Sequence, residues 1–323
     1  MHCFNNNYAL PAGVSFYSML EHANSNYDYR LYVLHTDITP ENQAKLQETI
    51  SGFKNASLEF INMGSRFDDL FLKTNIKSHY AKEMFYKFLP PSLFPQYDKI
   101  IITDVDVVWL GDISLGYFSF ETSEDIYLAG HRGGVLRGSW LEKYVETSYG
   151  ADFTKEEIEK LSTNACYWIF NLKKMRADGK EREFIEFATE NAHRIRQPEQ
   201  DVINMLCFPK IRHLPFRAVV CTYIYDLFKT DADMNNNTIY SAAELREGME
   251  NPVQLHYATH VKPWKNTGCT KSEEWFKVLV KTPFLKDYLT QMEQRVLLMA
   301  RNLLSFKVPF LSKTFALTIG RTC

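Results

Sequence analysis

The sequence lacks long apolar runs and any regular pattern of cysteines. No apolar stretch approaches the ~18 residues of a transmembrane helix, so we expect none. The 6 cysteines are scattered without a Cys-x-x-Cys pair, so neither a zinc site nor a disulfide framework is expected. The N-terminus shows no basic segment followed by an apolar run. We therefore expect no signal peptide and predict a cytoplasmic protein.

The chain also lacks an excess of charge of one sign. Its 37 basic and 39 acidic residues leave a net charge of −2, so no nucleic-acid partner is expected. Hydrophobic residues make up 45% and charged residues 24% of the 323 residues, which is normal for a soluble globular protein. This length is compatible with a large α/β domain.

Hydrophobic periodicity predicts an alternation of strands and helices. Strands are expected at 29–35, 57–62, 100–103, 126–130, 167–172 and 253–258. Helices are expected at 40–50, 81–89, 174–194 and 198–208. This alternation favours an α/β sheet with helices on both faces.

The most informative stretch is 99–112, KIIITDVDVVWLGD, which reads as a buried strand followed by two aspartates. Side chains alternate along an extended backbone, so Asp104 and Asp106 are expected on the same side. Two carboxylates about 4 Å apart repel by roughly 4 kcal/mol at an effective dielectric near 20, so such a pair favours a bound cation. At a strand end this indicates a divalent metal holding a nucleotide diphosphate. The alternative is a solvated Asp-rich turn, because the tripeptide is short and common.

A second motif, QLHYATHVKPW at 254–264, combines an imidazole with a cation. His256 follows a short apolar segment and could complete a coordination sphere begun by two carboxylates. Lys262 could then bind the phosphates that share the metal. The alternative for His256 is an ordinary core or surface histidine, and we interpret His260 as structural.

With these motifs the sequence resembles the retaining glycosyltransferases of family 8. Asp104-Val105-Asp106 is similar to the Asp-x-Asp of the family, and 256–264 is similar to its His-x5-Lys-Pro-Trp. Between them, TNACYWIFNLKKMR at 163–176 and QPEQDVIN at 197–204 are similar to two further family motifs. The motifs occur in the family order, and weaker similarity extends back to residue 5.

The resemblance implies a site, position by position. It implies metal ligands at Asp104, Asp106 and His256. It implies substrate contacts at Asn5, Asn7, Lys87, Asp104, Val105, Asn164, Gln200, His256, Thr259 and Lys262. It implies catalytic roles for Gln200, Asp201 and Lys262.

Within that set, Asn5 and Asn7 match the nucleoside loop and Lys262 matches the diphosphate-binding lysine. Three positions depart from the family pattern. Asn5 replaces a common carboxylate, while Cys166 and Thr259 stand where glycine is common. An amide at Asn5 changes the balance of hydrogen-bond donors and acceptors toward a base.

The resemblance further implies a GT-A type fold, mainly a parallel twisted sheet flanked by helices. We expect a catalytic domain at 1–275 and a helical, basic and apolar extension at 276–323. The implied reaction moves galactose or glucose from a UDP-hexose to a hydroxyl of a glycan, as in lipopolysaccharide or other cell-surface polysaccharide synthesis. Mn²⁺ is the expected cofactor, with Mg²⁺ as the alternative. Retention of configuration would use either Gln200 as nucleophile or a front-face route.

Three other activities stay open. One is a self- or protein-glucosylating enzyme like glycogenin, another is a sugar-nucleotide hydrolase, and the third is a catalytically idle glycan-binding protein. Intact mass after incubation with UDP-sugar alone distinguishes the first two from each other.

The C-terminal tail, 294–323, interleaves basic and apolar residues and contains no acidic residue. This pattern predicts peripheral contact with an anionic membrane, which would suit a lipid-linked acceptor on the inner face of the cell membrane. The alternative is an ordinary C-terminal helix that packs on the catalytic domain.

Overall fold

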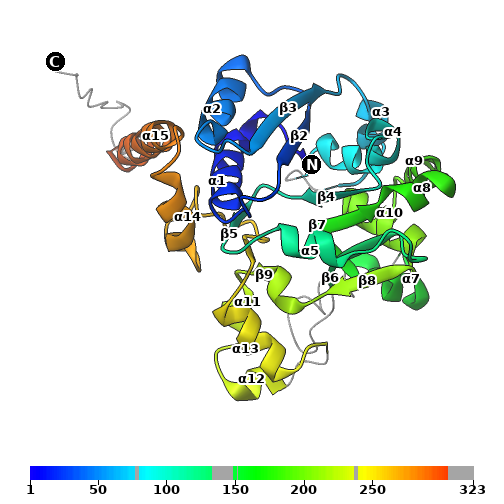
Figure 1. Cartoon of the computed structure of the whole chain (residues 1–323). Coiled ribbons are helices and arrows are strands. Elements are labelled where there is room, and N and C mark those ends of the chain that lie inside the picture. Colours follow the sequence, from blue (N-terminus) through cyan, green and yellow to red (C-terminus); the bar gives the residue numbers. More distant parts are fainter. Residues whose placement is uncertain (77–79, 133–147, 151, 236–238, 305–323) are drawn as a thin grey trace, which may run out of the picture.

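The computed structural model describes residues 1–76, 80–132, 148–150, 152–235 and 239–304. In these residues the strands form three hydrogen-bonded groups, in the orders β1-β2-β3, β4-β7-β6-β8 and β5-β10-β9 (Figure 1). The strands are β1 (His2–Cys3), β2 (Tyr29–His35), β3 (Ala56–Asn62), β4 (Lys99–Thr103), β5 (Val107–Trp109), β6 (Leu128–Arg132), β7 (Thr163–Asn171), β8 (Ile211–Leu214), β9 (Val220–Cys221) and β10 (Gln254–His256).

The helices lie around these strands (Figure 1). The α-helices are α1 (Ala9–Glu21), α2 (Pro40–Ile50), α3 (Asp68–Leu72), α4 (Pro90–Leu93), α5 (Ser114–Ser119), α7 (Lys155–Lys160), α8 (Leu172–Ala177), α9 (Lys180–Glu190), α10 (Pro198–Cys207), α11 (Ile224–Leu227), α12 (Asp231–Asn235), α13 (Ala242–Glu250), α14 (Ser272–Leu279) and α15 (Leu285–Leu304). The 3₁₀ helices are η1 (Asn6–Tyr8), η2 (Lys82–Phe88) and η3 (Phe216–Ala218).

The sheet is mixed, with parallel pairings in the majority among the described strands. The pairs β1/β2, β2/β3, β6/β8 and β9/β10 run parallel, whereas β4/β7, β6/β7 and β5/β10 run antiparallel. The Met1 amine donates to the Ile101 carbonyl at 2.7 Å, and the Thr103 amide donates to the Met1 carbonyl at 3.2 Å. These bonds join the first group of strands to the second.

Strand β7 is buried along nearly its whole length because both faces of the sheet are covered. Tyr167 and Ile169 belong to one hydrophobic core, together with residues of α1, β5 and α14. Trp168 and Phe170 point to the other face and pack into a second core built from η2, α9 and α10. The alternation of side chains along one strand thus supplies both cores.

Several predicted elements are confirmed, and two are helical as predicted but differ in helix type or number. β2 has the predicted bounds, and α2 begins after Thr39, whose hydroxyl accepts from the Asn42 amide. The segment expected as a helix at 81–89 is a 3₁₀ helix. The helix expected at 174–194 is two helices, because Gly179 adopts a left-handed φ of +67° between α8 and α9.

The C-terminal helices pack partly into the first hydrophobic core. Trp275, Leu279 and Phe284 are buried in the same core as α1. A Cβ at Gly13 of α1 would lie 2.4 Å from the Phe284 ring, so the ring seats directly on this glycine. The predicted boundary at 275/276 falls inside α14, and packing continues into α15 as far as Met292. Residues 305–323 of the predicted tail lie outside the described residues.

No helix in the described part of the chain is both long enough and apolar enough to cross a bilayer.

Candidate functional site

The two aspartates are held at the end of β4 by backbone hydrogen bonds. The Asp104 amide donates to the Cys166 carbonyl of β7 at 3.2 Å, and the Asp106 carbonyl accepts from the Tyr257 amide at 3.0 Å. β5 follows at once and pairs antiparallel with β10, in a register that sets His256 opposite Val107. The imidazole therefore lies beside Asp106, although 150 residues separate the two in the sequence (256 − 106).

The three side chains form a cluster that fits a divalent metal. The His256 Nε2 lies 3.4 Å from Asp106 Oδ1 and 3.9 Å from Asp104 Oδ2. One ligand atom from each residue lies within 4.8 Å of the others. Ligands about 2.0–2.6 Å from one ion are separated by roughly 3–5 Å, so the spacing suits a shared cation. The other imidazole nitrogen, Nδ1, lies 3.8 Å from the Cys221 sulfur.

Two lysines occupy the carboxylate oxygens that point away from His256. The Lys87 Nζ lies 2.7 Å from Asp104 Oδ1, and the Lys262 Nζ lies 2.5 Å from Asp106 Oδ2. Burial alone would raise the pKa of Asp106, but the Lys262 ammonium and His256 imidazole outweigh burial and hold that pKa well below its usual range. The carboxylate is therefore ionised and available to a cation.

Burial would lower the pKa of His256, but the Cys166 thiol and the Asp106 carboxylate raise it well above its usual value. The imidazole consequently holds a proton next to the carboxylates. Asp104, Asp106 and the neutral form of His256 would hold a divalent metal, so its binding would release that proton.

Glu199 is a site residue that the sequence reasoning missed. Its side chain is buried, and its Oε1 lies 2.7 Å from Lys87 Nζ, so one ammonium bridges Glu199 and Asp104. Burial alone would lower the pKa of Lys87, but the two carboxylates raise it above its usual value. The signal in the sequence was an acidic residue in the first turn of α10, directly before Gln200.

A cavity of about 840 Å³ opens beside the carboxylates. It brings together four predicted substrate-binding residues from two distant segments. These are Asn5, Asn7, Asp104 and Val105. Asn5 also caps η1, because its Oδ1 accepts from the Asn7 amide at 3.2 Å. The cavity volume lies in the usual range for ligand sites, ~300–1,000 Å³.

The residues predicted around the transferred sugar lie outside this cavity. Gln200 Oε1 accepts from the Ala165 amide at 2.7 Å, next to the Lys87 bridge. Asn164 borders a small separate cavity of about 30 Å³ together with the buried His131. Gln200 and Asn164 therefore do not share the cavity that Asn5 and Asn7 line.

The side chains of Asp201 and Thr259 accept hydrogen bonds from backbone amides of their own loops. Asp201 is 1% exposed and accepts hydrogen bonds from the Tyr149 hydroxyl and from the amides of Arg196 and Gln197. Burial raises its pKa to about 6. These hydrogen bonds fix the start of α10, and a catalytic role for Asp201 stays a prediction. The Thr259 hydroxyl accepts from the Val261 amide and braces the turn before Lys262.

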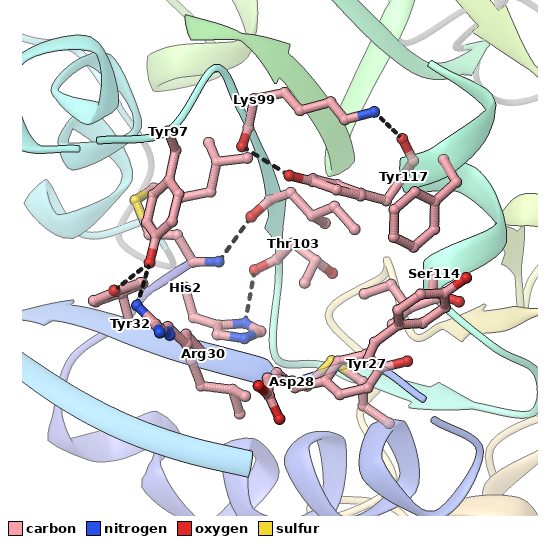
Figure 2. A pocket seen from close by; sticks show the side chains of 18 residues that line it. His2, Tyr27, Asp28, Arg30, Tyr32, Tyr97, Lys99, Thr103, Ser114 and Tyr117 are labelled. Atoms are coloured by element: carbon pink, nitrogen blue, oxygen red, sulfur yellow. Dashed lines mark hydrogen bonds between the residues drawn. The ribbon is translucent and has the colours of Figure 1, made fainter. Parts of the chain in front are cut away.

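A second cavity, of about 370 Å³, lies between β2 and β4 (Figure 2). Its lining is mainly apolar and includes paired tyrosines, with the Tyr32 and Tyr97 hydroxyls 2.8 Å apart. It runs along β4 from Lys99 to Thr103, and the two carboxylates that follow this strand do not line it. None of the predicted site residues lines it, so we assign it no part in the chemistry described below.

Comparison with known proteins agrees with this arrangement. Residues 1–268 match the model of glycosyl transferase family 8. General stress protein A of Bacillus subtilis (strain 168) is 23% identical over 293 residues, covering 87% of this chain and 92% of that protein.

Among solved structures, the galactosyltransferase LgtC in complex with donor and acceptor sugar analogues superposes with a TM-score of 0.65 at 17% identity, covering 87% of this chain and 95% of LgtC. The apo structure of the bifunctional glycosyltransferase WbbM superposes with a TM-score of 0.68 at 19% identity and covers 90% of this chain. This chain spans only 50% of the WbbM structure.

The mixed sheet with an Asp-x-Asp turn at a strand end is the GT-A fold of nucleotide-sugar transferases. The chain belongs to glycosyltransferase family 8.

Proposed function

We propose that this glycosyltransferase moves a hexose, galactose or glucose, from a UDP-sugar to a hydroxyl of a glycan acceptor with retention of configuration. The observation that supports this most directly is the Asp104, Asp106 and His256 cluster, whose two carboxylates line the 840 Å³ cavity. Two carboxylates and an imidazole suit Mn²⁺ better than Mg²⁺, which prefers oxygen ligands. We propose lipopolysaccharide or another cell-surface polysaccharide as the acceptor, reached from the cytoplasmic side.

The residues around the proposed metal site have different roles in the reaction. When bound, the metal supplies Lewis-acid stabilisation of the departing diphosphate. Lys262, next to Asp106, adds a positive charge on the same side. Lys87 fixes the orientation of Asp104 and, through Glu199, ties the metal-binding turn to the helix that carries Gln200. The metal-binding turn and the start of α10 are thereby fixed relative to each other.

Retention of configuration is best explained by a front-face route. An amide is a weak nucleophile, and the Gln200 oxygen already accepts a hydrogen bond from the Ala165 amide. That hydrogen bond draws electron density from the Gln200 oxygen and fixes the orientation of the side-chain amide. In the front-face route, the leaving phosphate accepts the proton of the acceptor hydroxyl, and Gln200 positions the sugar.

The test of this function is the mass balance after incubation with a UDP-hexose and Mn²⁺. We expect UDP release together with hexose on an added glycan acceptor. Free hexose without glycan product would identify a hydrolase instead. An increase of the intact protein mass by hexose units would identify a self-glucosylating enzyme.

Replacement of His256 and of Lys262 is expected to change Mn²⁺ and UDP binding in different ways. His256→Ala should weaken Mn²⁺ and UDP binding together, by about tenfold to a hundredfold, because both share one coordination sphere. Lys262→Ala should weaken UDP or slow transfer and leave Mn²⁺ binding in the absence of UDP nearly unchanged. Titration calorimetry of each variant with Mn²⁺, then with UDP, separates the two. Unchanged UDP affinity of His256→Ala in Mn²⁺ would contradict the ligand role.

We also propose that the end of α15 contacts an anionic membrane. Val296, Leu297, Leu298 and Met299 are 59–64% exposed on consecutive positions, and the sequence that follows contains Arg301, Lys307, Lys313 and Arg321 and no acidic residue. An exposed apolar segment beside basic residues suits a membrane interface. It would bring the site to a lipid-linked acceptor.

A double variant tests this contact. Leu297→Gln with Leu298→Gln should reduce co-sedimentation with vesicles containing anionic lipid by about tenfold or more, because each buried Leu contributes ~1.5–3 kcal/mol. Leu115→Gln on α5 is the matched control, since Leu115 is 67% exposed on a different element. Substitution is preferable to truncation after Glu293, which would also remove cavity residues Gln294 and Arg295. Equal binding of the wild type and the double variant would refute the contact.

A further inference from the structure

Helix α15 contributes one wall of the 840 Å³ cavity, and every residue that it places there is polar. These residues are Lys286, Asp287, Thr290, Gln291, Gln294 and Arg295. Their spacing of three and four residues puts them on one stripe of the helix. A different stripe, with Leu285, Tyr288 and Met292, packs on the hydrophobic core. The helix is thus oriented by its apolar contacts, so that a continuous polar stripe borders the cavity.

Two polar contacts hold this wall in position, one on each side of Gln291. Asp287 forms an ion pair with Lys45 of α2 at 2.8 Å. The Arg295 guanidinium donates to the Trp264 carbonyl at 3.0 Å, in the segment that follows Lys262. The Trp264 ring meets the Tyr8 ring edge to face, with centroids 5.9 Å apart. The wall is therefore connected both to the nucleoside loop and to the turn that carries Lys262.

The position of the cavity determines which part of a nucleotide-sugar can occupy it. The diphosphate belongs with the carboxylate cluster, which borders the cavity at Asp104 and Asp106. Asn164 and Gln200, which are predicted to surround the transferred sugar, do not line it. A donor anchored by its diphosphate would therefore extend its nucleoside into the space between the Asn5–Tyr8 segment and α15.

We propose that Gln291 and Gln294 of α15 contact the nucleoside and contribute to its selection. This inference rests on the proposed function and adds a second wall to the nucleoside site. Each primary amide carries two donors and an acceptor, which suits the mixed edge of a nucleobase or the hydroxyls of a ribose. Gln291 lies one helical turn from both anchors, Asp287 and Arg295. Its backbone position is therefore well determined before a ligand binds.

The test compares a ligand that has a nucleoside with one that lacks it. In Mn²⁺, Gln291→Ala and Gln294→Ala should each weaken UDP binding about threefold to tenfold, as expected for loss of one or two hydrogen bonds. Neither should change the binding of inorganic pyrophosphate. Lys262→Ala should weaken both ligands and serves as the diphosphate reference. Leu297→Ala, on the same helix and outside the cavity lining, should change neither.

Three results would overturn the inference. Unchanged UDP affinity in the Gln291→Ala and Gln294→Ala variants would refute it while leaving the proposed function standing. Equal weakening of UDP and pyrophosphate would show that the wall acts on the diphosphate or on the fold. Wild-type protein that binds Mn²⁺ and pyrophosphate but no nucleoside diphosphate would refute the proposed function itself, and this inference with it.

Discussion

Asp104→Asn and Asp106→Asn are each expected to reduce sugar transfer about a thousandfold or more. Each substitution removes one charged ligand from a cluster whose carboxylates stabilise a cation. Loss of about 4 kcal/mol of transition-state stabilisation by the metal corresponds to about a thousandfold in rate. The measurement is the initial rate of transfer at saturating Mn²⁺, together with circular dichroism to verify the fold.

The fold should survive both substitutions because Asn keeps an oxygen that can accept from Lys87 or Lys262. Asp98→Asn is the matched control. Asp98 precedes β4 at the end far from the cluster, and its side chain is 65% exposed. Its rate should equal that of the wild type. A variant at Asp104 or Asp106 with wild-type turnover in Mn²⁺ would show that the metal site is assigned to the wrong residues.

Lys87→Met is expected to destabilise the protein by about 3–5 kcal/mol. The Lys87 and Glu199 side chains are 2% and 4% exposed, so the substitution leaves a buried carboxylate without its cation. Chemical denaturation, followed by circular dichroism, measures the free energy of unfolding. Asp104 loses a partner too, and its side chain is 29% exposed, so water can compensate it in part.

A second substitution separates the buried charge from the lost packing. Glu199→Gln in the Lys87→Met background removes the uncompensated charge and should restore part of the stability. Lys87→Arg keeps the cation and should cost less than Lys87→Met. A loss below about 1 kcal/mol for Lys87→Met, or no recovery in the double variant, would contradict a buried ion pair that stabilises the fold.

The sequence predicted the elements whose patterns are local. The apolar and aromatic residues of 29–35 and the Thr39-Pro40 start of 40–50 are local signals, so β2 and α2 were both found with their observed bounds. The cluster of Asp104, Asp106 and His256 was also predicted, because an Asp-x-Asp after an apolar strand and the later His and Lys are recognisable motifs. Each of these features depends on a few neighbouring residues.

What the sequence could not predict depends on contacts between distant segments. The antiparallel pairing of β4 with β7 has no signature within either strand. Glu199 belongs to no recognisable motif, and only the fold brings Lys87 to it. The polar stripe of α15 could not be linked to a site from the sequence either, because only the fold places it beside the cavity that Asn5 and Asn7 line.

The most direct test of the central claim is UDP release from a panel of UDP-sugars, measured with Mn²⁺ and with a chelator in its place. The proposed function predicts release from at least one UDP-hexose that requires Mn²⁺ and is lost in Asp106→Asn. Release that proceeds equally with the chelator, or that persists in Asp106→Asn, would contradict it.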